Sequence, residues 1–160
     1  ILHDLDEEVQ VGLIGNQVVI RTAAVEICGI LVQGRFPNYK EVIPSEADKK
    51  VTFKVEALQS ALRRAALLTN EHSRGVALSF SDEQVRFSSS TPEAGEAEID
   101  ITLSDYHSDA VEIGFNPQYL LEMLRIVDED EVTFEFSDGK KPGLLRCGKS
   151  FLYVVMPVTV

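Results

Sequence analysis

The chain has 160 residues, a formal net charge of −11 from 26 acidic and 15 basic side chains, and two cysteines. Its length indicates one domain or one domain plus part of another, and its 44% hydrophobic content excludes a disordered acidic tail. Two cysteines exclude a disulfide-dense scaffold, the lack of an apolar run of about 18–20 residues excludes a membrane-spanning helix, and the bulk charge argues against a nucleic-acid partner.

The chain starts at Ile1, and its first residues carry no secretion signal. Because a natural start is normally Met, we interpret the sequence as an excised fragment. We expect the protein to be cytoplasmic.

Three short apolar segments open the chain and are typical of strands. They span residues 9–14, 17–21 and 25–32, with Gly15 and Asn16 as turn residues between the first two. A meander of about three strands is too small to enclose a core alone. Glycine and proline in residues 34–39 predict a loop, and the polar residues 43–50 are typical of a domain boundary.

After this boundary a strand is expected at residues 50–54, followed by a helix that begins at Val55. The helix is indicated by an apolar stripe at helical spacing, formed by Val55, Leu58, Ala61, Leu62, Ala65 and Leu68. Three strands follow, at residues 75–80, 84–88 and 96–103.

The same order then repeats, beginning with a strand at residues 110–115. Asn116 is a good N-cap and Pro117 a good first helical residue. The second stripe is formed by Leu120, Met123, Leu124 and Val127, and strands follow at residues 131–136, 143–146 and 151–156. We therefore predict an α+β fold of duplicated strand-helix-three-strand units, with two amphipathic helices side by side on an antiparallel sheet.

The faces opposite the two stripes carry basic side chains although the whole chain is acidic. The polar residues there are Glu56, Gln59, Ser60, Arg63 and Arg64 on the first helix and Gln118, Glu122 and Arg125 on the second, with Lys54 at the entrance. The acidic residues lie mostly elsewhere, so this face tolerates a phosphate backbone. Charge counting alone favours an ordinary solvated face.

The sequence contains no convincing catalytic or cofactor-binding motif. There is no phosphate-binding loop, and His3, His72 and His107 are isolated from zinc-ligand spacing. The acidic run at residues 128–131 is typical of a solvated turn, and residues 3–6 and 107–109 of polar loops. We predict a non-catalytic protein without a cofactor or metal.

The two cysteines differ in their surroundings. Cys28 lies in an apolar strand and is expected to be buried, whereas Cys147 precedes Gly148 and is expected to be more exposed.

Four segments carry a resemblance to a known family. Residues 34–39 (GRFPNY) with 42–44 (VIP) resemble the linker signature of the bacterial DNA polymerase III β subunit, the sliding clamp, and residues 153–160 (YVVMPVTV) resemble its closing sequence. Residues 70–76 and 114–116 match as well. The resemblance covers the whole chain.

The resemblance implies that residues 1–44 are the end of the clamp's middle domain plus a linker and that 45–160 form its third domain. Such subunits form a head-to-tail dimeric ring around duplex DNA, bind it without sequence specificity and confer processivity on the polymerase. The residues that would face DNA are Lys54, Arg63, Arg64, Gln118 and Arg125.

The family also holds short peptides of polymerases, clamp loader and repair proteins. The matching positions are Pro37, Val42, Asn116, Tyr119, Val154, Met156, Pro157 and Val158. Glu41 replaces a frequent basic residue, and Thr159 with Val160 replaces a basic-aliphatic ending. Without the resemblance, Val154, Met156 and Val158 are better interpreted as finishing a sheet.

Ring closure would use Leu67 and Leu68 together with Glu96 and Glu98. Two alternatives stay open: a small acidic metal-dependent hydrolase that uses residues 128–131 or His107, and a generic β-rich interaction domain.

Overall fold

The computed structural model describes residues 8–35, 38–44, 47–69, 75–92 and 95–160. The chain divides into two compact units, Ile1–Asn38 and Tyr39–Val160, each of which is described by itself. The predicted boundary after residue 44 lies a few residues beyond this division. The assignment of residues 1–44 and 45–160 to two domains stays a prediction.

The first unit is an antiparallel meander of β1 (Gln10–Ile14), β2 (Gln17–Arg21) and β3 (Glu26–Ile30) in that order. Its strands agree with the expected ones. Because the three strands enclose no core, none of their residues is fully buried, and Leu13 is 70% exposed. The prediction that Cys28 is buried is wrong for the same reason, since Cys28 is exposed.

The second unit opens with a short helix, α1 (Tyr39–Val42), which was not predicted: the expected loop ended at residue 39, and residues 40–42 were assigned to no element. Its single turn is closed by the Ile43 amide, which donates to the Tyr39 carbonyl at 3.2 Å. A four-residue helix is too short to show an apolar stripe, so helical periodicity could not reveal it.

The remaining elements repeat one order twice, which confirms the predicted duplication. The first copy contains β4 (Lys49–Lys54), α2 (Val55–Ala66), β5 (Val76–Ser81), β6 (Gln84–Thr91) and β7 (Gly95–Thr102). The second contains β8 (Val111–Phe115), α3 (Pro117–Arg125), β9 (Glu131–Phe136), β10 (Gly143–Cys147) and β11 (Phe151–Val155).

The strands form two four-stranded sheets, in the orders β7-β6-β5-β8 and β11-β10-β9-β4, where a single sheet was expected. Each sheet contains three strands of one copy and the first strand of the other. All pairs are antiparallel: β4 lies against β9, with Lys54 opposite Glu131, and β8 against β5. Alternation along a strand shows which face is buried but not which strand is its neighbour, so the sequence pattern could not show this exchange.

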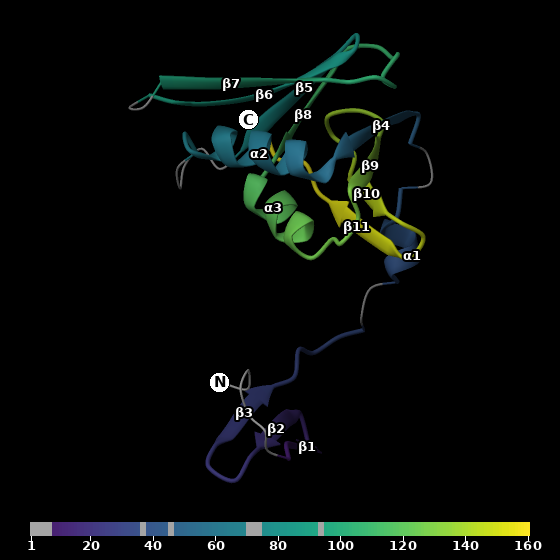
Figure 1. Cartoon of the computed structure of the whole chain (residues 1–160). Coiled ribbons are helices and arrows are strands. Elements are labelled where there is room, and N and C mark those ends of the chain that lie inside the picture. The colour runs from purple at the N-terminus through teal and green to yellow at the C-terminus, as the bar shows by residue number, and fades with distance from the viewer. Residues whose placement is uncertain (1–7, 36–37, 45–46, 70–74, 93–94) are drawn as a thin grey trace. The chain divides into compact units, whose positions relative to one another are not determined.

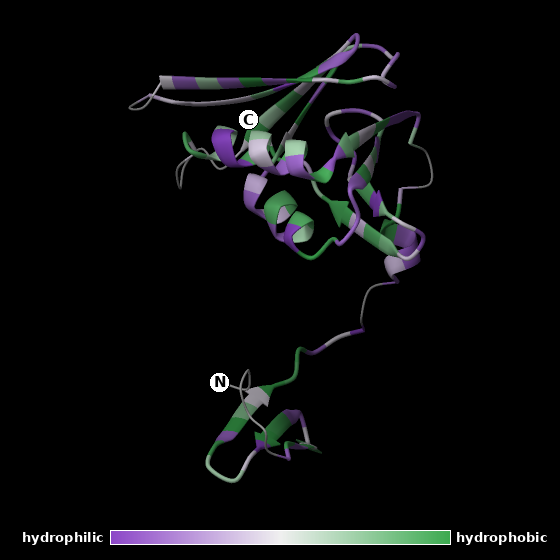
Figure 2. Ribbon diagram, viewed as in Figure 1, coloured by the Kyte–Doolittle hydropathy of each residue, from purple (hydrophilic) through white to green (hydrophobic). Residues whose placement is uncertain are grey.

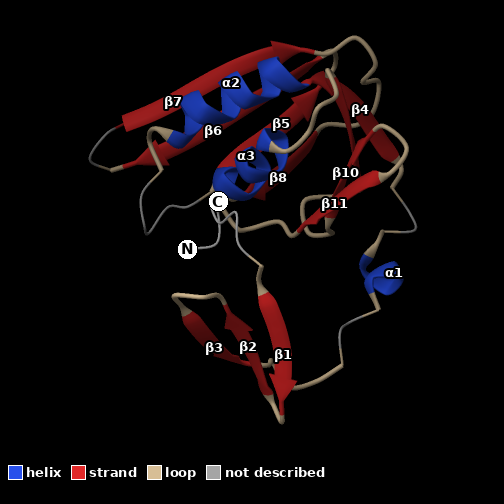
Figure 3. Ribbon diagram, turned by 60° about the horizontal axis from the view of Figure 1, so that its bottom comes forward, coloured by secondary structure: helices blue, strands red, loops and turns tan. Residues whose placement is uncertain are grey.

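The two helices pack against each other and lie on the same side of the β7-β6-β5-β8 sheet (Figures 1 and 3). Leu58, Leu62 and Ala65 of α2 are buried, as are Leu120 and Leu124 of α3, so both predicted stripes face the core. Figure 2 shows hydrophilic residues alternating with hydrophobic ones along both helices.

The helix ends are stabilised in different ways. Asn116 accepts a hydrogen bond from the Gln118 amide at 3.0 Å, which confirms the predicted N-cap of α3. Lys54 gives α2 no side-chain cap, and the Val55 amide instead donates to the Asp130 carbonyl at 2.9 Å. The loop before β9, which belongs to the second copy, therefore stabilises the first copy's helix.

Aromatic rings join the two sheets. Phe80 of β5 lies 4.5 Å from Phe136 of β9 between ring centroids, and Phe115 of β8 lies 5.7 Å from Phe134 of β9. Phe134 and Phe136 stack at 4.7 Å. Cys147 is buried in this core, which corrects the expectation that it is the more exposed cysteine, and burial raises the pKa of its thiol.

None of the helices in the described part of the chain is long and apolar enough to span a membrane.

Replacing Phe134 with Ala should lower the free energy of unfolding by about 3–5 kcal/mol, because the cavity opens where both sheets meet. Urea denaturation of the chain measures this loss. Leu152→Ala on the exposed side of edge strand β11 is the matched control and should cost about 0.5 kcal/mol or less. Equal losses for the two variants would contradict the central position of Phe134.

Candidate functional site

The five residues that the resemblance places toward DNA are all exposed. Lys54 ends β4, Arg63 and Arg64 lie in the last turn of α2, and Gln118 and Arg125 lie at the two ends of α3. None of the three arginines is ion-paired with another residue that the structure describes. The basic side chains of both helices therefore stay available to an external anion.

Gln59 on the same face has a second role. Its side-chain Nε2 donates to the Leu124 carbonyl at 2.8 Å, near the end of α3. This hydrogen bond joins α2 to α3. The sequence pattern could not predict it, because Gln59 was expected only to face solvent.

An open groove of about 1580 Å³ runs beside the N-terminal half of α2 and along β4, β9 and β10. Its basic and acidic lining side chains nearly balance; they are Lys50, Lys54, Arg63, Arg125 and Arg146 against Glu56, Asp128, Glu129, Asp130, Glu131 and Glu135. Arg146 Nε also donates to Glu135 at 2.9 Å. The acidic run thus lies beside the basic helix residues and weakens their attraction for a polyanion.

The segment after β11 lies at the start of α3. The Val158 amide donates to the Gly114 carbonyl at 2.8 Å, two residues before the cap residue Asn116. Met156 is 61% exposed and Val158 37% exposed, and Pro157 is half-buried. An apolar surface is therefore offered to solvent beside the β8–α3 junction.

Tyr119 on α3 belongs to the same region. Its side chain is 51% exposed, and α3 packs against β11. Burial raises the pKa of Tyr153 in β11, and the charges of Glu122 and Tyr119 raise it further, so these α3 side chains lie near Tyr153. Tyr153 was not among the expected site residues, because in the sequence it is one more residue of an apolar strand.

The remaining residues expected to bind a peptide lie less close to Tyr119 and the segment after β11. Val154 is half-buried on β11, and Val42 is exposed on α1, which makes no packing contact with β11 comparable to that of α3. Pro37 lies outside the described residues. The structure therefore brings together Asn116, Tyr119 and residues 156–160 after β11, which we call the tail.

Leu67 and Leu68 follow α2, with Leu67 80% exposed and Leu68 half-buried. The end of α2 is attached to the sheet by Ser89, whose hydroxyl donates to the Ala65 carbonyl at 2.6 Å. Ser89 lies opposite Ala97 of β7, an edge strand. The leucines thus lie near the start of that free edge.

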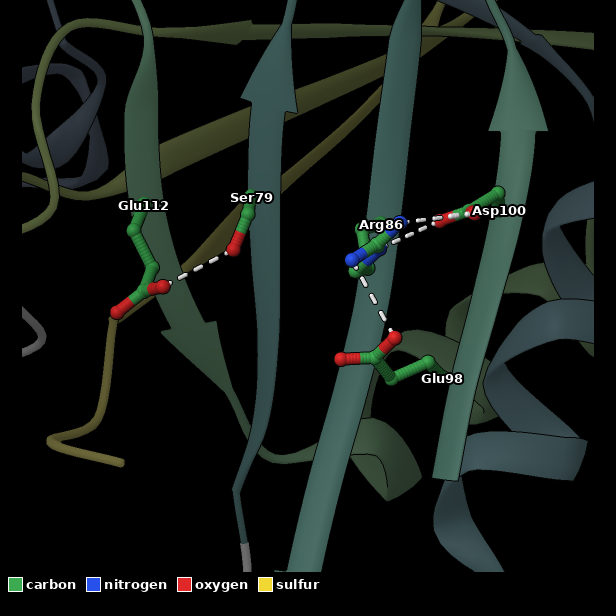
Figure 4. Close-up of polar contacts among 5 residues, drawn as sticks. All are labelled: Ser79, Arg86, Glu98, Asp100 and Glu112. Carbon is green, nitrogen blue, oxygen red and sulfur yellow. Dashed lines mark hydrogen bonds and ion pairs between the residues drawn. The ribbon is translucent and has the colours of Figure 1, made fainter. Parts of the chain in front are cut away.

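The carboxylates of β7 face away from α2. Arg86 binds Asp100 at 2.8 Å and Glu98 at 3.3 Å on the outer face of the sheet, where Ser79 also donates to Glu112 (Figure 4). The hydrogen bond from Arg86 lowers the pKa of Asp100. Glu96, also exposed on β7, lies two residues before Glu98.

The residues considered for metal or acid–base chemistry do not form a metal-ligand cluster: among the described residues, no three His, Cys, Asp or Glu side chains are grouped to hold an ion. His107, Asp82 and Asp109 line a shallow hollow of about 510 Å³. His3 and His72 lie outside the described residues.

Comparison with known proteins identifies the family. The family model described as DNA polymerase III beta subunit, C-terminal domain, matches residues 40–159. The chain belongs to this family.

Individual relatives agree with this family assignment. It is 36% identical over 157 residues to the beta sliding clamp of Pseudomonas putida, covering 96% of this chain and 42% of that protein. It is 37% identical over 132 residues to the beta sliding clamp of Escherichia coli, covering 80% of this chain and 35% of that one. The chain therefore spans less than half the length of these relatives.

Solved structures of the DNA polymerase III β-subunit family share the fold. The Pseudomonas aeruginosa DNA polymerase III subunit beta superposes with a TM-score of 0.78 at 33% identity, covering 99% of this chain and 44% of that one. A Bartonella birtlesii sliding clamp bound to griselimycin also gives 0.78 at 33% identity, with coverages of 95% and 41%.

Replacing Glu122 with Gln should lower the pKa of Tyr153 while leaving it above its ordinary value of about 10, because burial is the larger cause of the shift. Since the folded-state pKa is raised, Tyr153 stabilises the fold below pH 10 and loses this contribution as pH rises through that pKa. Tyrosine-selective ¹³Cζ NMR titration measures the pKa of Tyr153. Glu56→Gln is the control and should leave this pKa unchanged, because Glu56 is not among the charges that raise it. A Tyr153 pKa at its ordinary value in the unsubstituted protein would contradict the burial of this side chain against α3.

Proposed function

We propose that this chain is part of a DNA sliding clamp, a non-catalytic ring that encircles duplex DNA and confers processivity on the replicative polymerase. The observation that carries the proposal is the pair of helices on one side of a sheet, whose exposed faces carry basic residues in a chain of net charge −11. Relatives named beta sliding clamp support it. In this proposal, residues 1–44 belong to the middle domain and residues 45–160 form the third.

The helix face would hold DNA loosely. Lys54, Arg63, Arg64 and Arg125 would attract phosphates by charge, and Gln118 would add a neutral donor. Each phosphate contact adds affinity but no sequence preference. Because carboxylates lie in the neighbouring groove, the attraction stays weak enough for the ring to slide.

The tail region would bind the peptides through which polymerases, the clamp loader and repair proteins attach. Met156, Pro157, Val158 and Tyr119 supply exposed apolar surface, and a few polar groups beside it would orient a peptide. Pro37, Val42, Asn116 and Val154 complete the set that the family resemblance implies. The griselimycin-bound Bartonella structure supports a ligand site in the family.

Ring closure would join this domain head-to-tail to the first domain of a second subunit. Leu67 offers an exposed apolar contact at the end of α2, with Leu68 beside it, and Glu96 and Glu98 lie on the neighbouring edge strand β7. An apolar centre flanked by charged residues is a common arrangement in interfaces.

The hydrolase alternative gains no support from the comparisons, which return sliding clamps. A generic interaction domain would share the fold and lack peptide binding, so the peptide experiment below separates it from the clamp.

Reversing the charge of Arg63 and Arg64 together to Glu should shorten retention of the loaded full-length ring on nicked circular DNA by about tenfold, because phosphate attraction becomes repulsion. Retention is measured by gel filtration at fixed salt. The control reverses Lys140 and Lys141, which are exposed between β9 and β10 at the end remote from Lys54, with the same change in charge. Equal retention of both variants would rule out a DNA-facing role for the arginines.

Replacing Met156 and Pro157 together with Ala should weaken binding of a fluorescent peptide carrying the polymerase's clamp-binding segment by about tenfold or more. The reason is the loss of exposed apolar contact area. Fluorescence anisotropy with the full-length protein measures the affinity. Ile126→Ala, an exposed apolar residue at the end of α3, is the control and should bind normally. Unchanged affinity of the double variant would eliminate the tail as a peptide site.

A further inference from the structure

The tail that follows β11 crosses two glycines from neighbouring strands. Gly114 lies in β8 and Gly75 directly precedes β5, and the two strands pair with Val76 opposite Phe115 and Ala77 opposite Gly114. Val158 donates its amide to the Gly114 carbonyl at 2.8 Å. Since β8 is an edge strand, this hydrogen bond places the tail along its free side.

Neither glycine has room for a side chain. A Cβ at Gly114 would lie 2.4 Å from the Val158 carbonyl oxygen and 2.8 Å from a methyl of Val160. A Cβ at Gly75 would lie 2.0 Å from Val160 Cγ1. All three distances are below 3.0 Å, closer than a Cβ atom approaches its neighbours in real proteins, since ordinary van der Waals contact between carbon atoms is about 3.5–4.0 Å.

Backbone conformation does not explain glycine at either position. The glycines with positive φ in the described chain are Gly15, Gly34, Gly95 and Gly148, so Gly75 and Gly114 have angles that other residues adopt. Close approach of the tail is therefore the feature of these two positions that demands glycine.

The contact also decides where the exposed tail residues lie. Met156 and Pro157 directly precede Val158, whose hydrogen bond is made two residues before the α3 cap Asn116. Moving Val158 off β8 would move Met156 and Pro157 relative to Tyr119, which α3 carries.

We infer that Gly75 and Gly114 form a seat for the tail and act as positioning residues for the peptide site, an inference that rests on the proposed function. The seat consists of the backbone at the two glycines, the Val158 hydrogen bond and the Val160 methyl groups. It presents Met156 and Pro157 in a fixed position before a peptide arrives, which reduces the ordering that binding requires.

Amide hydrogen exchange at Val158 tests the seat without a ligand. Gly114→Ala should speed this exchange by about tenfold, because the added methyl pushes away the main-chain oxygen of Val158. Gly12→Ala, in strand β1, is the matched control, since a Cβ there meets no atom within 4 Å. Exchange in Gly114→Ala equal to that in Gly12→Ala would overturn the seat.

A double-variant cycle gives a second test that does not depend on Gly114. Gly75→Ala should also speed exchange at Val158, and adding Val160→Ala should restore it, because the atom in the way is Val160 Cγ1. The same addition should not restore Gly114→Ala, whose nearest neighbour is the Val158 carbonyl oxygen. Equal rescue of both glycine variants, or of neither, would contradict the geometry of the seat.

Peptide affinity, measured as above on the full-length ring, separates the seat from the function. The positioning role is supported if Gly114→Ala and Gly75→Ala both bind the peptide more weakly, and if adding Val160→Ala restores the affinity of Gly75→Ala but not that of Gly114→Ala. If Val158 exchanges faster while the peptide binds as tightly as before, the positioning role fails and the seat stands. Whether the tail is a peptide site is then decided separately by the Met156 and Pro157 double variant.

Discussion

The exchange of first strands between two repeated units is the constraint on which this domain depends. β4 leaves the copy that contains α2 and pairs with β9, and β8 pairs with β5 in return. Neither copy can complete its sheet alone, so the two copies share one core. The aromatic rings of Phe80, Phe115 and Phe134 fill the place where the sheets meet. Burial of such large rings supplies much of the favourable free energy of a small domain.

The exchange also arranges the polar surface. Because β4 ends opposite the start of β9, the acidic loop before β9 is brought to the beginning of α2, where the Asp130 carbonyl receives the Val55 amide. The carboxylates of this loop therefore share a groove with Lys54 and Arg125. A net charge of −11 is compatible with arginines on the exposed helix faces, since most of the acidic residues lie on other elements and charges of both signs nearly balance within the groove.

The tail connects the same two sheets a second time. β11 is the edge strand of one sheet, and the residues after it cross β8, the edge strand of the other. An edge strand with free main-chain groups is a place where another chain can add. At Gly114 the protein's own tail occupies this position. The contact holds Met156 and Pro157, which precede it, in a defined place on the surface.

The sequence by itself determined most of the local structure. The apolar stripes, the cap at Asn116 and the repeated order of elements predicted α2, α3 and each strand that the structure describes, because these features depend on neighbours a few residues apart. The outward arginines and the family resemblance in the linker and closing segments also came from the sequence, and the family model that matches residues 40–159 agrees with that resemblance.

Only the tertiary structure decided the strand partners, the opposite burial of Cys28 and Cys147, the hydrogen bond from Gln59 to Leu124 and the glycine seat. Each of these joins residues that are distant in the chain or depends on whether a second layer covers a strand. Local periodicity describes the faces of an element. It does not show which other strand, helix or segment packs against those faces.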